Sequence, residues 1–347
     1  MKARFLLLVS VAVSLCAAAP PDADQVVVPA RMIKGSSTGL LWPSGLAVDQ
    51  SGTLFVANDG DLATGGQDSL TVYAPNANGD AKPLRTIAGP LTGLTRPNGV
   101  AVDASGALYV ANTGVSGSGE SVVGQDRVLI FAPGASGDVA PVRFIKDAVI
   151  RPRGVALDGR GFIYISNYGA MVDAENSVTV YKMGASADPA PVRRIAGSRT
   201  TLDTPLALTV GLHGDIFVVN SGRVNMGIDS IIIFAPGASG NAAPARVITG
   251  DKTLLNVPQS VSVDPAGYIY VTNFGNSTIS VYAPNANGNA APVQLIGGPD
   301  AALGAYVEGT AFGNNGDYYV VNRPQLPNSD FSWICVFSRA TLGAKAP

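Results

Sequence analysis

The sequence predicts an all-β protein, a six-bladed β-propeller with four antiparallel strands in each blade. One pattern occurs six times along the chain, and every copy closes on an asparagine. The closing residues are Asn58, Asn112, Asn167, Asn220, Asn273 and Asn322, at steps of 49 to 55 residues. Self-similarity at this period is typical of propellers and solenoids. Because the first five copies also carry four strand signals each, the propeller is favoured.

The strand signals follow one order in each copy. Residues 97–112 read PNGVAVDASGALYVAN, which predicts strands at 100–103 and 108–112 joined by a glycine turn. Such runs of Val, Ile, Tyr and Phe bounded by Gly, Pro, Asn and Asp are typical of strands. The predicted third strands are 70–73, 128–131, 178–181, 231–234, 279–282 and 334–337, and the predicted fourth strands are 84–87, 142–145, 192–195, 245–248 and 293–296.

The connection from the third to the fourth strand is nearly constant. It reads APGASGDVAP at 132–141 and APNANGNAAP at 283–292, and related sequences stand in three other copies. Its Asn-Gly pairs are turn formers because both residues tolerate positive φ. Since the loop recurs in five places, we interpret it as architectural rather than catalytic.

The sixth copy lacks a fourth strand of its own. No Pro-x-Arg-x-Ile pattern follows Phe337, but residues 29–35 read PARMIKG and match PVRRIAG at 191–197. We therefore expect the N-terminal strand to complete the last blade. Ring closure of this kind removes the free sheet edges that would otherwise invite aggregation.

Composition favours one folded domain. The 347 residues are 46% hydrophobic and 14% charged, with a net charge of −2. These values exclude a disordered chain and give no basic footprint for nucleic acid. The length suggests two domains, but each repeat needs its neighbours, so we predict a single propeller domain at 26–340.

The first residues predict export. Residues 1–19 resemble a signal peptide, with Lys2 and Arg4, an apolar run at 5–15 and small residues at 17–19. The apolar run is shorter than the ~20 residues that a membrane span needs, so we expect a secreted or periplasmic protein. Lipoprotein anchoring at Cys16 is the less favoured alternative, because the bulky Leu15 precedes it.

One cysteine remains after the predicted signal peptide. It is Cys335, in the predicted third strand of the last blade. A lone cysteine allows no internal disulfide. We expect its thiol to be buried and slow to react.

At these residues the chain resembles the NHL-repeat β-propellers, of the secreted bacterial type. The motif is a Pro-x-Gly-Ile-Ala-Val-Asp strand, a glycine turn and an Ile-Tyr-Val-Ala-Asp/Asn strand, followed by a third strand that ends in an aromatic residue. The resemblance spans 29–338, close in five copies and loose in the sixth. It implies the fold but no single function, since the family includes protein-binding and carbohydrate-binding modules and a few enzymes.

The resemblance implies a ligand site at the mouth of the central channel. There the residue after each repeat's proline points towards the mouth. Across the copies this residue is Ser44, Asn98, Arg153, Leu206, Gln259 and Glu308. The predicted ligand-binding residues are the polar members, Ser44, Asn98, Arg153, Gln259 and Glu308. The alternative is a wet channel in which these side chains only bind water.

Metal binding is a weaker interpretation of the same region. Glu308 with Asn98 is the best candidate set, and oxygen ligands of this kind suit Ca²⁺. The closing asparagines more simply bond backbone at strand ends, and the acids Asp68, Asp126 and Asp229 each fit a turn hydrogen bond before a third strand. No cofactor is therefore predicted, with Ca²⁺ as the alternative.

Histidine chemistry is excluded by composition. His213 is the only histidine, and it lies in a predicted turn on the opposite face of the propeller. The enzymes of this fold that use a zinc-histidine site or a histidine base therefore offer no template for this chain.

These observations favour an extracytoplasmic, non-catalytic binding or scaffold protein. Its expected partner is a protein, a glycan or a small ligand, and the chain is expected to be a monomer with no nucleic-acid partner and no membrane span. The first alternative is a divalent-metal-dependent, gluconolactonase-like hydrolase that uses the channel mouth. The second is a structural protein of the cell envelope.

Overall fold

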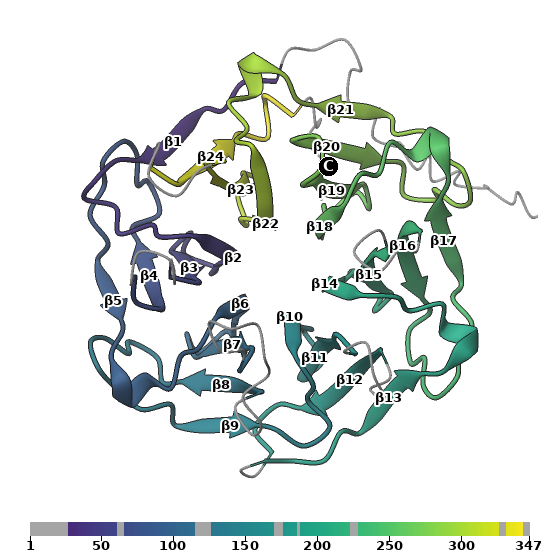
Figure 1. Ribbon diagram of the computed structural model, residues 1–347, viewed down its shortest axis with the longest axis horizontal. Coiled ribbons are helices and arrows are strands. Elements are labelled where there is room, and N and C mark those ends of the chain that lie inside the picture. The colour runs from purple at the N-terminus through teal and green to yellow at the C-terminus, as the bar shows by residue number, and fades with distance from the viewer. Residues whose placement is uncertain are drawn as a thin grey trace, which may run out of the picture.

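The computed structural model is a closed ring of six four-stranded antiparallel sheets around a central axis (Figure 1). It describes residues 27–60, 66–114, 126–169, 176–185, 188–222, 228–325 and 331–342. The predicted all-β, six-bladed propeller is confirmed. The predicted signal peptide and Cys16 lie outside the described residues. Within these residues, no helix is long and apolar enough to cross a membrane.

Each blade runs from an inner strand at the axis to an outer strand at the rim (Figure 1). Blades one to three contain β2 (Pro43–Val48), β3 (Leu54–Asn58), β4 (Ser69–Tyr73) and β5 (Arg85–Ile87); β6 (Pro97–Val102), β7 (Leu108–Asn112), β8 (Arg127–Phe131) and β9 (Arg143–Ile145); and β10 (Pro152–Leu157), β11 (Phe162–Asn167), β12 (Ser177–Lys182) and β13 (Arg193–Ala196). Blades four to six contain β14 (Pro205–Val210), β15 (Ile216–Ser221), β16 (Asp229–Phe234) and β17 (Arg246–Thr249); β18 (Pro258–Val263), β19 (Ile269–Asn273), β20 (Thr278–Tyr282) and β21 (Gln294–Ile296); and β22 (Tyr306–Phe312), β23 (Tyr318–Arg323), β24 (Trp333–Phe337) and β1 (Arg31–Lys34).

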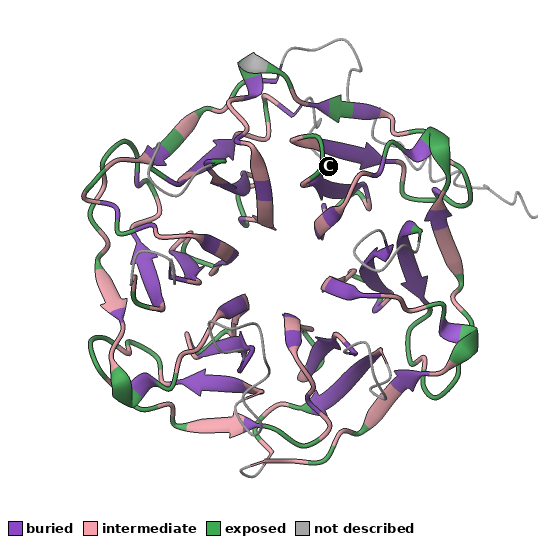
Figure 2. Ribbon diagram, viewed as in Figure 1, coloured by how far each residue is buried: buried purple, intermediate pink, exposed green. Residues whose placement is uncertain are grey.

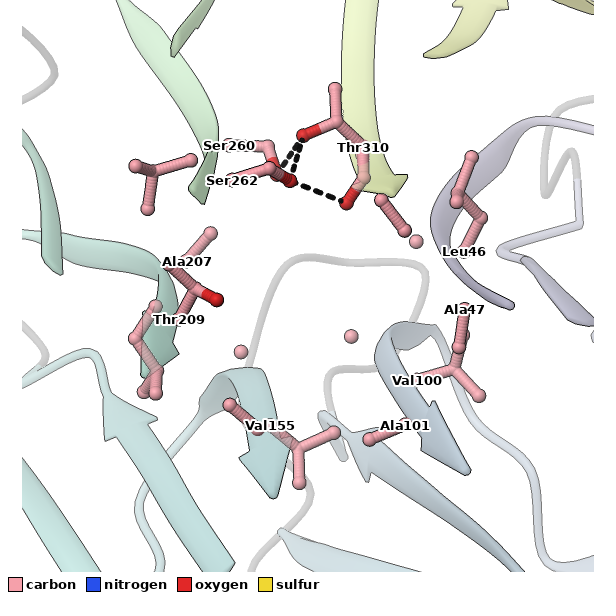
Figure 3. A pocket seen from close by; sticks show the side chains of 18 of the residues that line it. Leu46, Ala47, Val100, Ala101, Val155, Ala207, Thr209, Ser260, Ser262 and Thr310 are labelled. Carbon is pink, nitrogen blue, oxygen red and sulfur yellow. Dashed lines mark hydrogen bonds between the residues drawn. The ribbon is translucent and has the colours of Figure 1, made fainter. Parts of the chain in front are cut away.

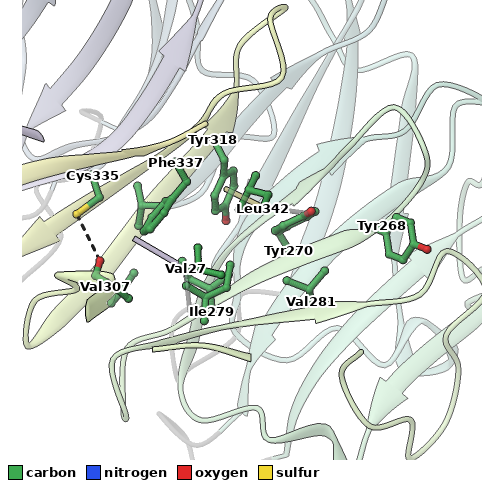
Figure 4. Packing of buried hydrophobic residues seen from close by; sticks show 13 residues of the cluster. Val27, Tyr268, Tyr270, Ile279, Val281, Val307, Tyr318, Cys335, Phe337 and Leu342 are labelled. Atoms are coloured by element: carbon green, nitrogen blue, oxygen red, sulfur yellow. Dashed lines mark hydrogen bonds between the residues drawn. The ribbon is translucent and has the colours of Figure 1, made fainter. Parts of the chain in front are cut away.

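The N-terminal strand closes the ring, as predicted. β1 pairs antiparallel with β24, with Met32 opposite Cys335 and Lys34 opposite Trp333. The outer edge of blade six is therefore filled by a segment from the other end of the chain. Val27, before this strand, packs into the apolar cluster between blades five and six, which also contains Leu342 (Figure 4).

The apolar core lies between the blades. One cluster joins Phe55 and Leu70 of blade one to Val100 and Leu108 of blade two, and comparable clusters fill the other junctions. Middle strands are therefore buried on both faces, while the rim strands are partly exposed (Figure 2). Cover on both faces explains why the strands read as apolar runs without strict alternation.

In blades one, two, four and five, the near-constant loop joins the blade to the one before it. The amide of Gly79 donates to the Met32 carbonyl at 2.7 Å, and the amide of Lys34 donates back to the Gly79 carbonyl at 2.9 Å. The same parallel bridge forms at Gly137, Gly240 and Gly288. Gly79 has a φ of 62°, a left-handed conformation that glycine adopts without strain. The architectural interpretation of this loop is thus confirmed.

Short 3₁₀ turns were not predicted. They follow the fourth strands at Pro90–Thr92, Ser198–Thr200, Asp251–Thr253 and Pro299–Ala301. In the first three, a threonine hydroxyl donates to a glycine carbonyl three residues earlier, as Thr92 does to Gly89 at 2.7 Å. This local bond stabilises a single turn that is too short to show helical periodicity in the sequence.

Candidate functional site

The six inner strands enclose a cavity of about 380 Å³ on the propeller axis. Its wall is built from β2, β6, β10, β14, β18 and β22 (Figure 3). These strands approach one another closely. A Cβ atom on Gly99 would lie 2.9 Å from the carbonyl oxygen of Arg153 on the next blade, so a small residue is required where the strands converge.

All six predicted channel residues line this cavity. Two of them bond mainly to neighbouring groups of the blades. Ser44 donates its hydroxyl to the Pro97 carbonyl of the next blade at 2.7 Å. The side-chain amide of Asn98 donates to the Arg96 carbonyl at 2.8 Å and to the Thr113 hydroxyl at 3.0 Å. These two residues therefore hold the blade structure together in addition to facing the channel.

Glu308 carries the negative charge of the cavity wall. Its Oε1 atom lies 3.6 Å from a guanidinium nitrogen of Arg323, and both side chains are nearly buried. Burial raises the pKa of Glu308, while Arg323 and then Arg153 act in the opposite direction. The net effect is a raised pKa for Glu308, because burial outweighs the effect of the two nearby arginines.

Arg153 carries the positive charge of the wall. It lies on β10 in blade three, across the ring from Glu308 on β22 in blade six (Figure 1). Burial lowers its pKa, against the stabilising charges of Glu308 and Asp59. Within the described residues, no carboxylate lies within 4 Å of its guanidinium. Arginine stays protonated in proteins, so Arg153 is a cation with free donors.

Arg323 was missed by sequence reasoning. It follows the closing asparagine of the sixth copy, and its Nε atom donates to the Pro43 carbonyl of blade one at 2.8 Å. Its guanidinium also lies over the Trp42 ring, 5.3 Å from the ring centroid. The available signal was a break in the repeat: the position after the closing asparagine is a cation only here.

A second ion pair stands at the same end of the propeller. Asp59 Oδ1 lies 3.3 Å from the Nε atom of Arg96. Burial raises the pKa of Asp59, although Arg96 and Arg323 lower it. This end of the channel therefore carries three guanidinium groups, those of Arg96, Arg153 and Arg323. They lie near two carboxylates, those of Asp59 and Glu308.

The acidic residues before the third strands accept hydrogen bonds from the next blade, and not only within their own turns as predicted. Asp126 accepts the Arg151 amide of the next blade at 2.9 Å, and Asp229 accepts the Val257 amide at 2.9 Å. Both amides belong to residues with positive φ, 41° and 50°. These two carboxylates thus hold strained backbone directly before β10 and β18.

Asp68 is the exception in this set. Its Oδ2 atom accepts the Arg96 amide at 3.1 Å, but its Oδ1 atom has no partner among the described residues. In Asp126 the matching oxygen accepts the Gly114 amide at 2.9 Å. Burial raises the pKa of Asp68 to about 6, with a smaller raising effect from Asp59.

The closing asparagines are structural, as expected. Each is buried, and each Oδ1 atom accepts a backbone amide 17 or 18 residues earlier in the chain, as Asn58 does from Leu41 at 3.1 Å and Asn322 does from Gly304 at 2.9 Å. Four others do the same. His213, the only histidine, lies in an exposed turn as predicted.

The residues at the mouth do not fit a divalent cation. Ca²⁺ binds six to eight oxygen atoms, mostly from carboxylates and carbonyls. Here Glu308 and Asp59 are each paired with an arginine, and a third arginine, Arg153, interacts electrostatically with both carboxylates. Among the described residues, no three His, Cys, Asp or Glu side chains are placed to hold a metal ion. The surplus of guanidinium groups favours an anion or a polarised carbonyl instead.

Fold and cavity together define a six-bladed β-propeller with a charged opening at one end of its channel. No family model matches the chain, so its place among the NHL-repeat proteins stays a prediction. No curated protein matches it either. Solved structures do match, over most of its length.

The similar structures include three propellers described by an activity. The PQQ-bound aldose sugar dehydrogenase from Streptomyces coelicolor is 15% identical, with a TM-score of 0.61, over 91% of this chain and 99% of its own. A putative glucose dehydrogenase-type oxidoreductase from Thermus thermophilus is 15% identical, with a TM-score of 0.56, over 88% and 99%. A gluconolactonase from Xanthomonas campestris is 14% identical, with a TM-score of 0.52, over 92% and 97%. At these identities the likeness establishes the propeller fold.

The comparisons correct the prediction of a non-catalytic binding or scaffold module. Two similar propellers are described as sugar dehydrogenases and one as a gluconolactonase. They favour the enzymatic alternative over the main interpretation of the sequence. The repeat pattern could not reveal this because it is shared by propellers of many functions, and chemistry depends on a few residues that interrupt it.

Proposed function

We propose that this protein is an enzyme that hydrolyses a small cyclic ester, of the sugar-lactone class, at the mouth of its channel. The observation that carries the proposal is the pairing of Glu308 with Arg323, with the free guanidinium of Arg153 across the cavity. A carboxylate of raised pKa and a partly buried cation can supply the base and the charge stabilisation that lactone opening requires.

Glu308 acts as the general base in this proposal. Its carboxylate takes a proton from a water molecule as the water oxygen bonds to the lactone carbonyl carbon. When the ring C–O bond breaks, the same side chain returns the proton to the departing ring oxygen, so the product is a hydroxy acid. A base is most effective when its pKa is near the working pH, and burial moves Glu308 in that direction.

Arg153 stabilises the negative charge that develops on the carbonyl oxygen. A fixed cation in a partly desolvated site lowers the energy of such an intermediate more than it does in water. The product carries a new carboxylate, which the surplus of arginines near the mouth also suits. Arg323 touches neither reacting atom in this scheme, so it is a positioning residue for Glu308.

The likeness to the Xanthomonas gluconolactonase supports the reaction class, while the residues of this chain argue for a route without a metal. One similar structure holds PQQ, so a cofactor is compatible with the fold. PQQ carries three carboxylates. Among the described residues, Arg96 and Arg323 are already paired with carboxylates of this chain, which leaves only Arg153 to bind one of them. The described mouth therefore fits this quinone poorly, and we assign it no step.

The test is hydrolysis of D-glucono-1,5-lactone by purified mature protein, followed as acid release at constant pH. We expect a rate above spontaneous hydrolysis that persists in EDTA, and a loss of about 100-fold or more in kcat for Glu308→Gln. The control is Arg31→Gln, which breaks an ion pair with Asp317 away from the cavity. A rate equal to the spontaneous one, or a Glu308→Gln variant as active as the parent, would show that the proposal is wrong.

Location and family also remain proposals. We place the protein outside the cytoplasm, because residues 1–19 read as a signal peptide, and we propose kinship with the NHL-repeat propellers on the motif. Mass spectrometry of the protein recovered from the periplasm or the medium tests the proposed location. A measured mass that still includes residues 1–19 would overturn it.

A further inference from the structure

Three hydroxyl groups gather on one side of the channel. Ser260 and Ser262 lie on β18, and Thr310 lies on the neighbouring β22, all lining the cavity (Figure 3). Ser260 Oγ lies 3.3 Å from Thr310 Oγ1, and Ser262 Oγ lies 2.9 Å from the same atom. Ser262 Oγ also donates to the Thr310 carbonyl, at 3.2 Å.

The three contacts are satisfied together by a single arrangement of protons. A carbonyl only accepts, so Ser262 donates to it. Thr310 must then donate to Ser262, and Ser260 must donate to Thr310. All three hydroxyl protons are used within the cluster. Ser260 keeps two lone pairs and Ser262 keeps one, so the cluster presents acceptors to the channel.

The rest of the wall at this level is mainly apolar. Leu46 and Ala47 of blade one, Val100 and Ala101 of blade two and Val155 of blade three surround the cavity away from the hydroxyl cluster (Figure 3). A ligand here meets a hydrocarbon surface on one side and lone pairs on the other. Sugar rings have this character, with C–H faces and hydroxyl edges.

We propose that Ser260, Ser262 and Thr310 form a subsite for the hydroxyl groups of a polyhydroxylated substrate, an inference that rests on the proposed function. Thr310 stands two residues beyond Glu308 on β22, so both residues line the same part of the channel wall. A six-membered lactone with its carbonyl at Glu308 and Arg153 brings its ring hydroxyls to this depth. Hydroxyls can donate to the lone pairs of the cluster, whereas a carbonyl or a carboxylate can accept only by breaking a hydrogen bond within it. The subsite therefore selects both the substrate class and its orientation.

The test compares two lactones that differ in hydroxyl content. D-Glucono-1,5-lactone carries ring hydroxyls, and δ-valerolactone has none. We expect Ser260→Ala and Ser262→Ala to lower kcat/KM for gluconolactone by about fivefold each, the ratio that a neutral hydrogen bond provides. The same variants should change kcat/KM for δ-valerolactone by less than about twofold. Thr209→Val is the matched control, since Thr209 lines the same cavity on β14 outside the cluster.

A binding measurement separates this inference from the proposed function. 1,5-Anhydro-D-glucitol has the ring and hydroxyls of the substrate but no carbonyl to attack. We expect saturation-transfer NMR to show that it binds the parent and the Thr209→Val variant, and that binding is weakened in Ser260→Ala and Ser262→Ala. If no lactone is hydrolysed, the proposed function fails and this titration alone decides the subsite. Unchanged anhydroglucitol binding in both serine variants, or equal losses on both lactones, overturns it.

Discussion

Glu308 and Arg323 form an ion pair of 3.6 Å that connects the cavity wall to the junction of blades six and one. The carboxylate faces the channel, while the arginine also donates to the Pro43 carbonyl at 2.8 Å. The position of the proposed base is therefore set where the ring closes.

Replacing Arg323 tests its positioning role. Arg323 lowers the pKa of Glu308 against the effect of burial, so Arg323→Gln should raise that pKa further. Since the base must be ionised, the acidic limb of the pH–rate profile for lactone hydrolysis should move to higher pH. Arg31→Gln is the control, because it breaks a 3.3 Å pair with Asp317 away from the cavity. An acidic limb that stays in place would rule out coupling between Arg323 and the base.

The raised pKa of Asp68 predicts that the protein becomes less stable as the pH rises through the acidic range. Its pKa is about 6 in the folded state and about 3.9 in an unfolded chain. Between these values the folded state binds more protons, so the free energy of unfolding falls as pH rises from about 4 to about 6. Because the residue is partly exposed, we expect a loss of only about 1 kcal/mol.

The variant Asp68→Asn should remove this dependence. An amide oxygen can still accept the Arg96 amide, and asparagine already occupies this slot as Asn176. We expect the variant to be more stable than the parent at pH 7 by about 1 kcal/mol and equal to it near pH 4. Urea unfolding at both pH values measures the difference. A variant less stable at pH 7 would show that the charged form is favoured.

The repeated pattern allows the fold to be predicted from the sequence. It does not allow the site to be predicted, because the site depends on contacts that are not repeated. Blade number, strand order and closure by residues 29–35 follow from the repeated pattern, because each copy makes the same contacts. The ion pair of Glu308 with Arg323 does not, because its geometry depends on the contact between the first and last blades. The bond from Asp126 to Arg151 was likewise assigned to a local turn, since sequence separation does not reveal which blade an oxygen faces.

Ring closure can be tested within a single strand. Ile33 is 1% exposed and Met32 is 36% exposed, and they point to opposite faces of β1. We expect Ile33→Ala to lower the free energy of unfolding by about 2–4 kcal/mol, as buried aliphatic truncations do. Met32→Ala is the matched control and should cost well under half as much. Equal and small losses in urea unfolding would mean that this strand is not packed in the last blade.

Deleting residues 26–35 should have a larger effect than either substitution. The deletion exposes the edge of β24 and uncovers the apolar surface that β1 protects. A free, apolar edge strand is a site of aggregation, so we expect loss of soluble protein or a large drop in Tm. Light scattering and thermal unfolding of the truncated chain measure both. A truncated protein that stays soluble and melts like the full mature chain would contradict closure by this segment.

The thiol of Cys335 reports on the same blade. It is fully buried in β24, between β23 and β1, and its Sγ atom lies 3.4 Å from the Ala302 carbonyl. Burial raises its pKa to about 12, so the reactive thiolate is scarce at neutral pH. We expect a thiol reagent such as DTNB to label the native protein at least about 100-fold more slowly than the urea-unfolded protein. The deletion of residues 26–35 removes the cover from β24 and should accelerate labelling. Rapid labelling of the intact native chain would place Cys335 at the surface and count against the packing of the last blade.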